Sequence, residues 1–153
     1  SEAPTYDNTT SHRFYDSVGI GSYAADVHQL REHRGLKPHF EKPAPFYIPY
    51  RALLSKNIAN LLGSGKNMAQ TFITNSAYRL HPIEWASGSA AGTAAGVLFN
   101  ARQSDGADTP AWFLKSKPAL QRLQRAVAEN SPIAWKAWND SEFPATPFEP
   151  YNP

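Results

Sequence analysis

Residues 82–102 read PIEWASGSAAGTAAGVLFNAR and form the clearest structural element of this sequence. Proline suits the first turn of a helix, where its missing N–H costs nothing. The carboxylate of Glu84 falls in the same turn and complements the positive end of the helix dipole. We therefore predict a long helix over this stretch.

Three glycines give this helix an unusual face. Gly88, Gly92 and Gly96 recur every four residues and so lie along one side of the helix. Glycine inside a helix costs about 1 kcal/mol relative to alanine, so three of them need a physical reason. A face without side chains lets another backbone or a flat ligand come very close.

Three explanations of the glycine face compete. A membrane-spanning dimer helix of the small-xxx-small type is disfavoured, because the segment is too short and too polar. Tight packing of the helix on a sheet is expected to account for part of the pattern. The third explanation, which we favour, is that the helix start points its free N–H groups at the anionic or electron-rich edge of a cofactor.

The remaining predicted elements are short and separated by irregular, proline-rich segments. They comprise a strand within residues 14–23, an edge strand at 46–50, a turn at 51–54, a buried strand at 60–62 that enters a glycine turn, and partial helix within 66–80. Residues 118–129 form a second helix, which is amphipathic through Leu120, Leu123 and Val127.

The composition of the chain argues against several classes of function. The 153 residues are 41% hydrophobic and carry a net charge of +2 without a basic block, which gives nucleic-acid binding little support. The absence of cysteine excludes disulfides, thiolate metal sites and cysteine nucleophiles. No apolar run is long enough to cross a bilayer. The chain starts with polar residues and without methionine, which suggests that it has been processed. A secreted or periplasmic location is possible, and the sequence does not identify the compartment.

Several short segments stand in a fixed order before and within the glycine-rich helix. They are Ile48-Pro49-Tyr50-Arg51-Ala52-Leu53-Leu54, Asn60-Leu61-Leu62, Gly65-Lys66-Asn67, Arg79, Pro82 and Gly88-Ser89-Ala90-Ala91-Gly92-Thr93-Ala94-Ala95. In this order, residues 48–96 resemble the C-terminal signature of a family of FAD-dependent oxidoreductases, the group similar to xanthan-lyase-associated proteins. Weaker likeness extends the resemblance over most of residues 13–135. Lys66 stands where the family usually has arginine, and His81 and Trp85 stand where smaller or sulfur-bearing residues are common.

The resemblance implies an α/β fold: the C-terminal portion of an FAD/NAD(P)-binding, Rossmann-like domain with irregular proline-rich segments, completed by another chain. The expected organisation is a loose arm at 1–12, part of a substrate-binding region at 13–45, the FAD-binding portion at 46–138 and a proline- and aromatic-rich tail at 139–153.

The family's ADP-binding fingerprint, Gly-x-Gly-x-x-Gly after a first strand, is missing from its expected place. Gly19-Ile20-Gly21-Ser22-Tyr23-Ala24 fits the pattern, but no convincing strand precedes it and no acidic residue follows at the required distance. We interpret it as a decoy. A second chain is therefore expected to supply the N-terminal half of the FAD site.

The resemblance also implies residue roles. The expected FAD contacts are Gly65, Lys66 and Asn67 in the turn and Gly88, Ser89, Ala90 and Ala91 in the helix. Tyr78, Arg79 and His81 would line the substrate side, with Arg79 clamping an anion and His81 acting as a base while hydride leaves the substrate. Each role has an alternative without function. Residues 65–67 could form an ordinary polar turn, residues 88–91 could serve helix packing alone, and His81 could be a structural histidine. No metal site is expected.

The predicted function is flavin-dependent oxidation or reduction of a small molecule, with FAD as cofactor. Two rivals remain: a non-catalytic structural subunit of a larger complex, and a free-standing small binding module.

Overall fold

The computed structural model describes residues 14–23 and 46–130. Its elements are β1 (Ser17–Gly21), β2 (Phe46–Pro49), the 3-10 turns η1 (Tyr50–Leu53) and η2 (Gly65–Asn67), α1 (Phe72–Tyr78), α2 (His81–Ser104), the 3-10 turn η3 (Pro110–Leu114) and α3 (Lys117–Asn130). The two predicted helices and the two short strands at residues 14–23 and 46–50 are confirmed. The arm at 1–12, the tail at 139–153 and most of the segment 13–45 lie outside the described residues.

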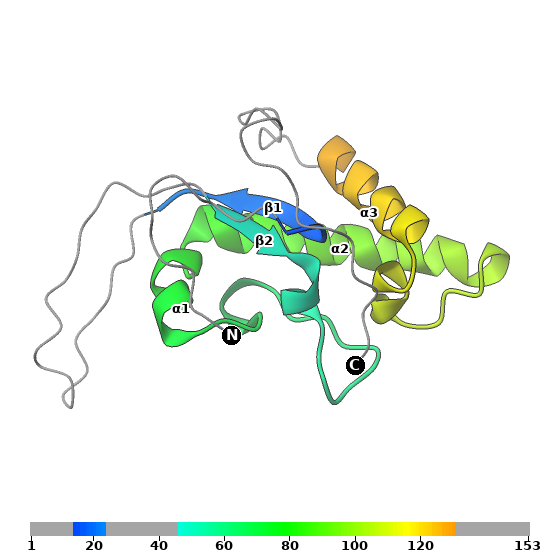
Figure 1. Cartoon of the computed structure of the whole chain (residues 1–153), viewed down its shortest axis with the longest axis horizontal. Coiled ribbons are helices and arrows are strands. Elements are labelled where there is room, and N and C mark those ends of the chain that lie inside the picture. The colour runs from blue at the N-terminus through cyan, green and yellow to red at the C-terminus, as the bar shows by residue number, and fades with distance from the viewer. Residues whose placement is uncertain (1–13, 24–45, 131–153) are drawn as a thin grey trace, which may run out of the picture.

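A small sheet on a long helix organises the described part of the chain. The strands β1 and β2 pair antiparallel and lie across α2, as Figure 1 shows. The helix α3 packs against α2 and against η3, beyond the end of the sheet. This mixed α/β arrangement agrees with the predicted class.

The sheet lies close to α2 because glycines in β1 leave room for it. A Cβ on Gly19 would lie 2.9 Å from Cδ1 of Ile48 and 3.5 Å from Cβ of Ala86. A Cβ on Gly21 would collide with the ring of Phe46 and lie 2.8 Å from Cγ1 of Ile83. Close helix-on-sheet packing is therefore real, but its glycines belong to the strand.

The buried face of α2 is an alanine face. Ala86, Ala90, Ala94 and Ala101 are all buried, together with Leu98. By contrast, a Cβ added at Gly88, Gly92 or Gly96 would meet none of the described residues within 4 Å. The prediction that the helix glycines pack on the sheet is wrong for the described chain, because the alanines, which share the same four-residue spacing, already fill that role.

The predicted buried strand at residues 60–62 is also wrong. Only Leu62 pairs with another strand-like residue, through an isolated bridge to Leu54, and the side chain of Leu61 is 48% exposed. The turn that follows is anchored instead by the N–H of Gly63, which donates to the carbonyl of Leu53 at 2.7 Å. Two adjacent leucines after Asn60 do not by themselves distinguish a buried strand from a half-exposed loop.

The aromatic rings of Tyr50 and Phe113 belong to the same buried cluster as the residues between the sheet and α2. The hydroxyl of buried Tyr50 donates to the carbonyl of Pro110 at 3.0 Å, and its ring meets Phe113 edge-on. Leu120, Leu123 and Val127 of α3 are buried, as the amphipathic pattern predicted. This packing holds α3 and η3 to the segment that precedes the candidate site.

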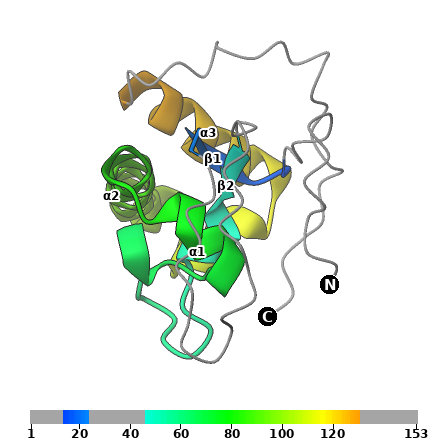
Figure 2. The same cartoon turned by 90° about the vertical axis from the view of Figure 1, so that its left-hand side faces the viewer.

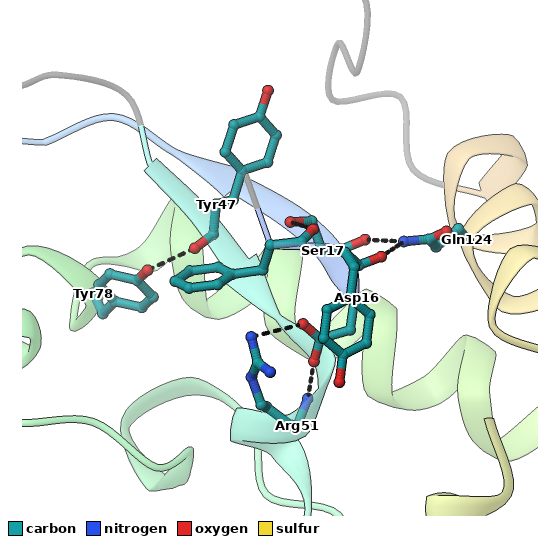
Figure 3. Close-up of polar contacts among 8 residues, drawn as sticks. Asp16, Ser17, Tyr47, Arg51, Tyr78 and Gln124 are labelled. Atoms are coloured by element: carbon teal, nitrogen blue, oxygen red, sulfur yellow. Dashed lines mark hydrogen bonds and ion pairs between the residues drawn. The ribbon is translucent and has the colours of Figure 1, made fainter. Parts of the chain in front are cut away.

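A buried carboxylate ties the start of β1 to η1 (Figure 3). One oxygen of Asp16 accepts the backbone N–H of Arg51 at 2.9 Å, and the other lies 3.2 Å from Nη2 of the same residue. The guanidinium of Arg51 lies over the rings of Phe14 and Tyr15. From α3, the side-chain amide of Gln124 donates to the carbonyls of Tyr15 and Ser17.

In the part of the chain that the structure describes, no helix combines the length and the apolar character needed to cross a membrane.

Candidate functional site

The two stretches singled out in the sequence lie side by side. The turn η2 packs against the first turns of α2, and the N–H of Gly65 donates to Oγ of Ser87 at 2.8 Å. Ser87 is buried, and its hydroxyl donates in turn to the carbonyl of Glu84 at 3.0 Å. Gly65 has φ +58, a left-handed conformation that glycine adopts without strain. The sequence therefore shapes the turn to dock on the helix.

The carboxylate of Glu84 joins the two elements. Its Oε1 lies 3.4 Å from Nζ of Lys66 in the turn, and its Oε2 lies 3.0 Å from Nδ1 of His81 at the helix start. The hydrogen bond with His81 and, less strongly, the charge of Lys66 hold the pKa of Glu84 below its ordinary value, against an opposing effect of desolvation. Glu84 is thus ionised at neutral pH.

The start of α2 offers fewer free donors than the sequence suggested. Pro82 has no N–H, and the N–H groups of Ile83 and Glu84 both donate to the carbonyl of Leu80, at 2.9 and 2.8 Å. The carboxylate of Glu84 also occupies this turn. The prediction that the helix start presents several free N–H groups to an anionic edge is therefore corrected.

The open face of α2, defined by Gly88, Gly92 and Gly96, is the strongest remaining candidate for a ligand. Spacings of three and four residues place His81 and Trp85 on this same face. Their exposures support this, since the side chain of His81 is 93% exposed and Trp85 is 66% exposed. Figure 2 looks almost along α2. In this view the helix lies at the left of the described part of the chain, and the strands β1 and β2 lie to its right.

The predicted site residues divide into three groups. Gly65 and Lys66 meet the first turns of α2, where His81 also lies, as the contacts above show. Ala90 points away from this group, because its side chain is buried in the core. The hydroxyl of Tyr78 donates to the carbonyl of Tyr47 at 2.7 Å and its ring stacks on Phe46, so it holds α1 to β2 (Figure 3).

The remaining predicted residues lie around the turn Gly65–Asn67 and along α2. Arg79 caps the end of α1 and is half-buried just before α2. Asn67 is exposed at the end of η2, and Gly88, Ser89 and Ala91 are half-buried on α2.

Sequence reasoning did not assign Glu84 and Ser87 to the site. Their positions carry a signal, since Glu84 lies three residues after His81 and Ser87 three residues after Glu84. Residues three apart are neighbours on a helix surface. A polar row in an otherwise small, apolar helix was therefore visible in the sequence.

Replacing Ser87 with alanine tests the contact between turn and helix. The N–H of Gly65 would lose its acceptor in a half-buried position, so we expect the Ser87→Ala variant to be less stable by about 1–2 kcal/mol. Urea unfolding of the chain measures this, with Ser89→Ala as the matched control. Equal stability of the two variants would show that the hydrogen bond does not hold the turn.

The segment Gly19–Ala24, which fits the ADP-binding pattern, does not form a phosphate-binding loop at Gly19 and Gly21. Gly19, Ile20 and Gly21 lie inside β1, paired with β2 in an extended conformation, rather than in a turn that opens a helix. Their role in close packing against α2 accounts for both glycines.

The described part of the chain is thus a mixed α/β structure in which a glycine turn docks on the start of a long helix. The family model for FAD dependent oxidoreductase matches residues 5–107, about two thirds of the chain. The chain belongs to this family, it is an oxidoreductase, and its cofactor is FAD. No curated protein and no solved structure matches the chain.

The residues present fit part of such a cofactor. Among the described residues, none lies within 4 Å of a Cβ placed at Gly88, Gly92 or Gly96, so a flat ring could approach the helix backbone there. Lys66 supplies a cation at the rim, although Glu84 already pairs with it. Among the described residues, no group of three or more His, Cys, Asp or Glu side chains is placed to hold a metal ion.

Proposed function

We propose that this chain forms the flavin-ring side of the active site in an FAD-dependent oxidoreductase that acts on a small molecule. The flavin ring would lie against the open face of α2, beside the turn Gly65–Asn67. On the order of its motifs, we further assign the chain to the group similar to xanthan-lyase-associated proteins.

The observation that carries this proposal is the empty space beside three helical glycines. Glycines in a helix interior are unfavourable, and here no contact among the described residues uses the room they leave. The exposed rings of Trp85 and Phe99 lie on the same side of the helix. An apolar, side-chain-free surface with aromatic borders suits a flat, largely apolar ring system.

The chemistry divides between cofactor and protein. FAD, when bound, accepts a hydride from the substrate. His81 would take the accompanying proton, and its high exposure leaves it open to a ligand. Arg79, just before α2, would bind a carboxylate or another anionic group of the substrate. Ser89 and Ala91 would border the flavin along the helix.

A second chain would supply the ADP-binding half of the site. The glycines that fit the ADP fingerprint are used in β1, so the described part of this chain does not offer that fingerprint in a loop. The partner would also cover the outer surface of α2, where Trp85 and Phe99 are exposed.

Native purification tests the proposal. The protein is isolated from its natural source without denaturation, and its absorbance spectrum is recorded beside a denaturing gel. We expect the visible bands of oxidised flavin, together with a larger co-purifying chain, and bleaching of those bands by a small-molecule substrate.

The rival functions predict other results. A colourless complex with a partner chain would favour a structural subunit that has lost flavin. A colourless, monomeric and cooperatively folding chain would favour a small binding module, and either result would overturn the proposed function.

A further inference from the structure

The side chain of Glu84 makes contacts that its place in the helix dipole does not require. Oε2 lies 3.0 Å from Nδ1 of His81, and Oε1 lies 3.4 Å from Nζ of Lys66. The backbone carbonyl of the same residue accepts the hydroxyl of Ser87. Glu84 is therefore held from both oxygens, between the helix start and the turn.

This arrangement fixes which nitrogen of His81 carries the proton. An ionised carboxylate only accepts hydrogen bonds, so the 3.0 Å contact requires a proton on Nδ1. In the neutral imidazole the lone pair then resides on Nε2. The side chain of His81 is almost fully exposed, so Nε2 is open to a bound molecule.

We propose that Glu84 is a positioning residue that holds His81 in the Nδ1–H form, with Nε2 as the atom that receives the substrate proton. The inference rests on the proposed function for the identity of the reaction. As a substrate C–H bond breaks, its hydride passes to FAD, and the proton of the adjoining O–H or N–H group forms a new bond to Nε2. The substrate is thereby oxidised by two electrons, and His81 becomes the imidazolium, with Nδ1–H still directed at Glu84.

Lys66 gives Glu84 a fixed orientation. The ammonium group on Oε1 keeps the carboxylate from turning freely, so that Oε2 stays directed at Nδ1. Among the described residues, His81 and Lys66 are the charged or titratable groups in contact with this carboxylate. The turn Gly65–Asn67 thus acts on the histidine through Glu84.

The tautomer of His81 can be read without flavin. We would record long-range proton–nitrogen NMR spectra of the nitrogen-labelled chain at mildly alkaline pH and assign the signal with a His81→Gln variant. The expected result is the Nδ1–H form in the wild type and loss of that preference in Glu84→Gln. An Nε2–H form in the wild type, or an unchanged preference in the variant, would overturn the proposal.

The kinetic consequence is measured in the flavin-loaded protein. A panel of alcohols, sugars and amines is screened for a member that bleaches the flavin, and the rate is followed against pH. His81→Gln should slow bleaching by about a hundredfold or more, Glu84→Gln should slow it less and change the pH profile, and Asp108→Asn should do neither.

The control removes a surface ion pair of the same kind, since Asp108 lies 3.6 Å from Lys115 outside the site. An unchanged pH profile in Glu84→Gln would overturn the positioning role while leaving the oxidoreductase proposal intact. If no panel member bleaches the flavin, the proposed function fails on this panel, and the tautomer measurement still decides the contact with Glu84.

Discussion

Replacing Arg51 with methionine should lower the free energy of unfolding at neutral pH by about 2–4 kcal/mol. The change removes the guanidinium that pairs with the carboxylate of Asp16, whose side chain is fully buried. Breaking a buried ion pair by removing one member typically costs about 3–5 kcal/mol. Arg51 is 36% exposed, so solvent moderates the loss somewhat. Urea unfolding with circular dichroism measures the difference.

The loss should depend on pH. Burial raises the pKa of Asp16 above its ordinary value, against the opposing backbone hydrogen bond and charge of Arg51. The folded state then binds this proton more tightly than the unfolded state, so the contribution of Asp16 to stability falls as pH rises through the folded pKa. Without the charge of Arg51, the pKa of Asp16 rises further.

The deficit of Arg51→Met should therefore shrink on acidification, as Asp16 becomes neutral. The double variant Asp16→Asn with Arg51→Met is the control, and it should be less destabilised at neutral pH than Arg51→Met alone. An equal deficit at neutral and acidic pH would mean that the charge of Asp16 is not what Arg51 compensates.

The second large effect is expected for Gly92→Leu, and it should fall on flavin binding rather than on folding. A Cβ at Gly92 meets none of the described residues within 4 Å, and Gly92 lies at an exposed position of α2, so we expect the new side chain to be tolerated. Replacing a helical glycine should even raise stability, by up to about 1 kcal/mol. Against a ring on the open face, the same side chain should weaken flavin binding by about 10- to 100-fold.

Two matched variants isolate this effect. Ala128→Leu adds a leucine to an exposed position of α3 and should leave flavin content unchanged. Gly21→Ala should destabilise the chain by about 1–3 kcal/mol, because its Cβ would meet Ile83 at 2.8 Å. Flavin content is measured by absorbance after native purification. Full flavin content in Gly92→Leu would remove the open face from the site.

The long elements were predictable from sequence because their signals are local. Pro82 and Glu84 mark the start of α2, and Leu120, Leu123 and Val127 give α3 its apolar stripe. The prediction of β2 as an edge strand rested on Pro49, because proline would interrupt a central strand. Each of these signals depends on neighbours within one or two turns or within one short strand.

The orientation of α2 was not predictable in the same way. Gly88 and Gly92 share their four-residue spacing with Ala86 and Ala90, so periodicity defines two small-residue faces without saying which one is buried. The answer depends on Gly19 and Gly21 in a strand far away in the sequence, whose missing side chains admit the alanine face.

The sequence predicted which segments form the candidate site, but it did not predict the side-chain contacts that join them. The order of motifs brought the turn Gly65–Asn67 and the start of α2 into one site, and the structure places them in contact. The link through Glu84 needed coordinates, because Lys66 and Glu84 are 18 positions apart and their pairing depends on how the turn docks.

The central claim, that flavin lies on the open face of α2, is tested most directly with a thiol placed on that face. The chain has no cysteine, so an Ala95→Cys variant carries a single reactive thiol at an exposed position beside Gly96. Its rate of labelling by a thiol reagent is compared in flavin-loaded and flavin-stripped protein, with Ala128→Cys as the control. We predict slower labelling of the first variant when flavin is bound and no change in the control. Equal rates with and without flavin in Ala95→Cys would contradict the account.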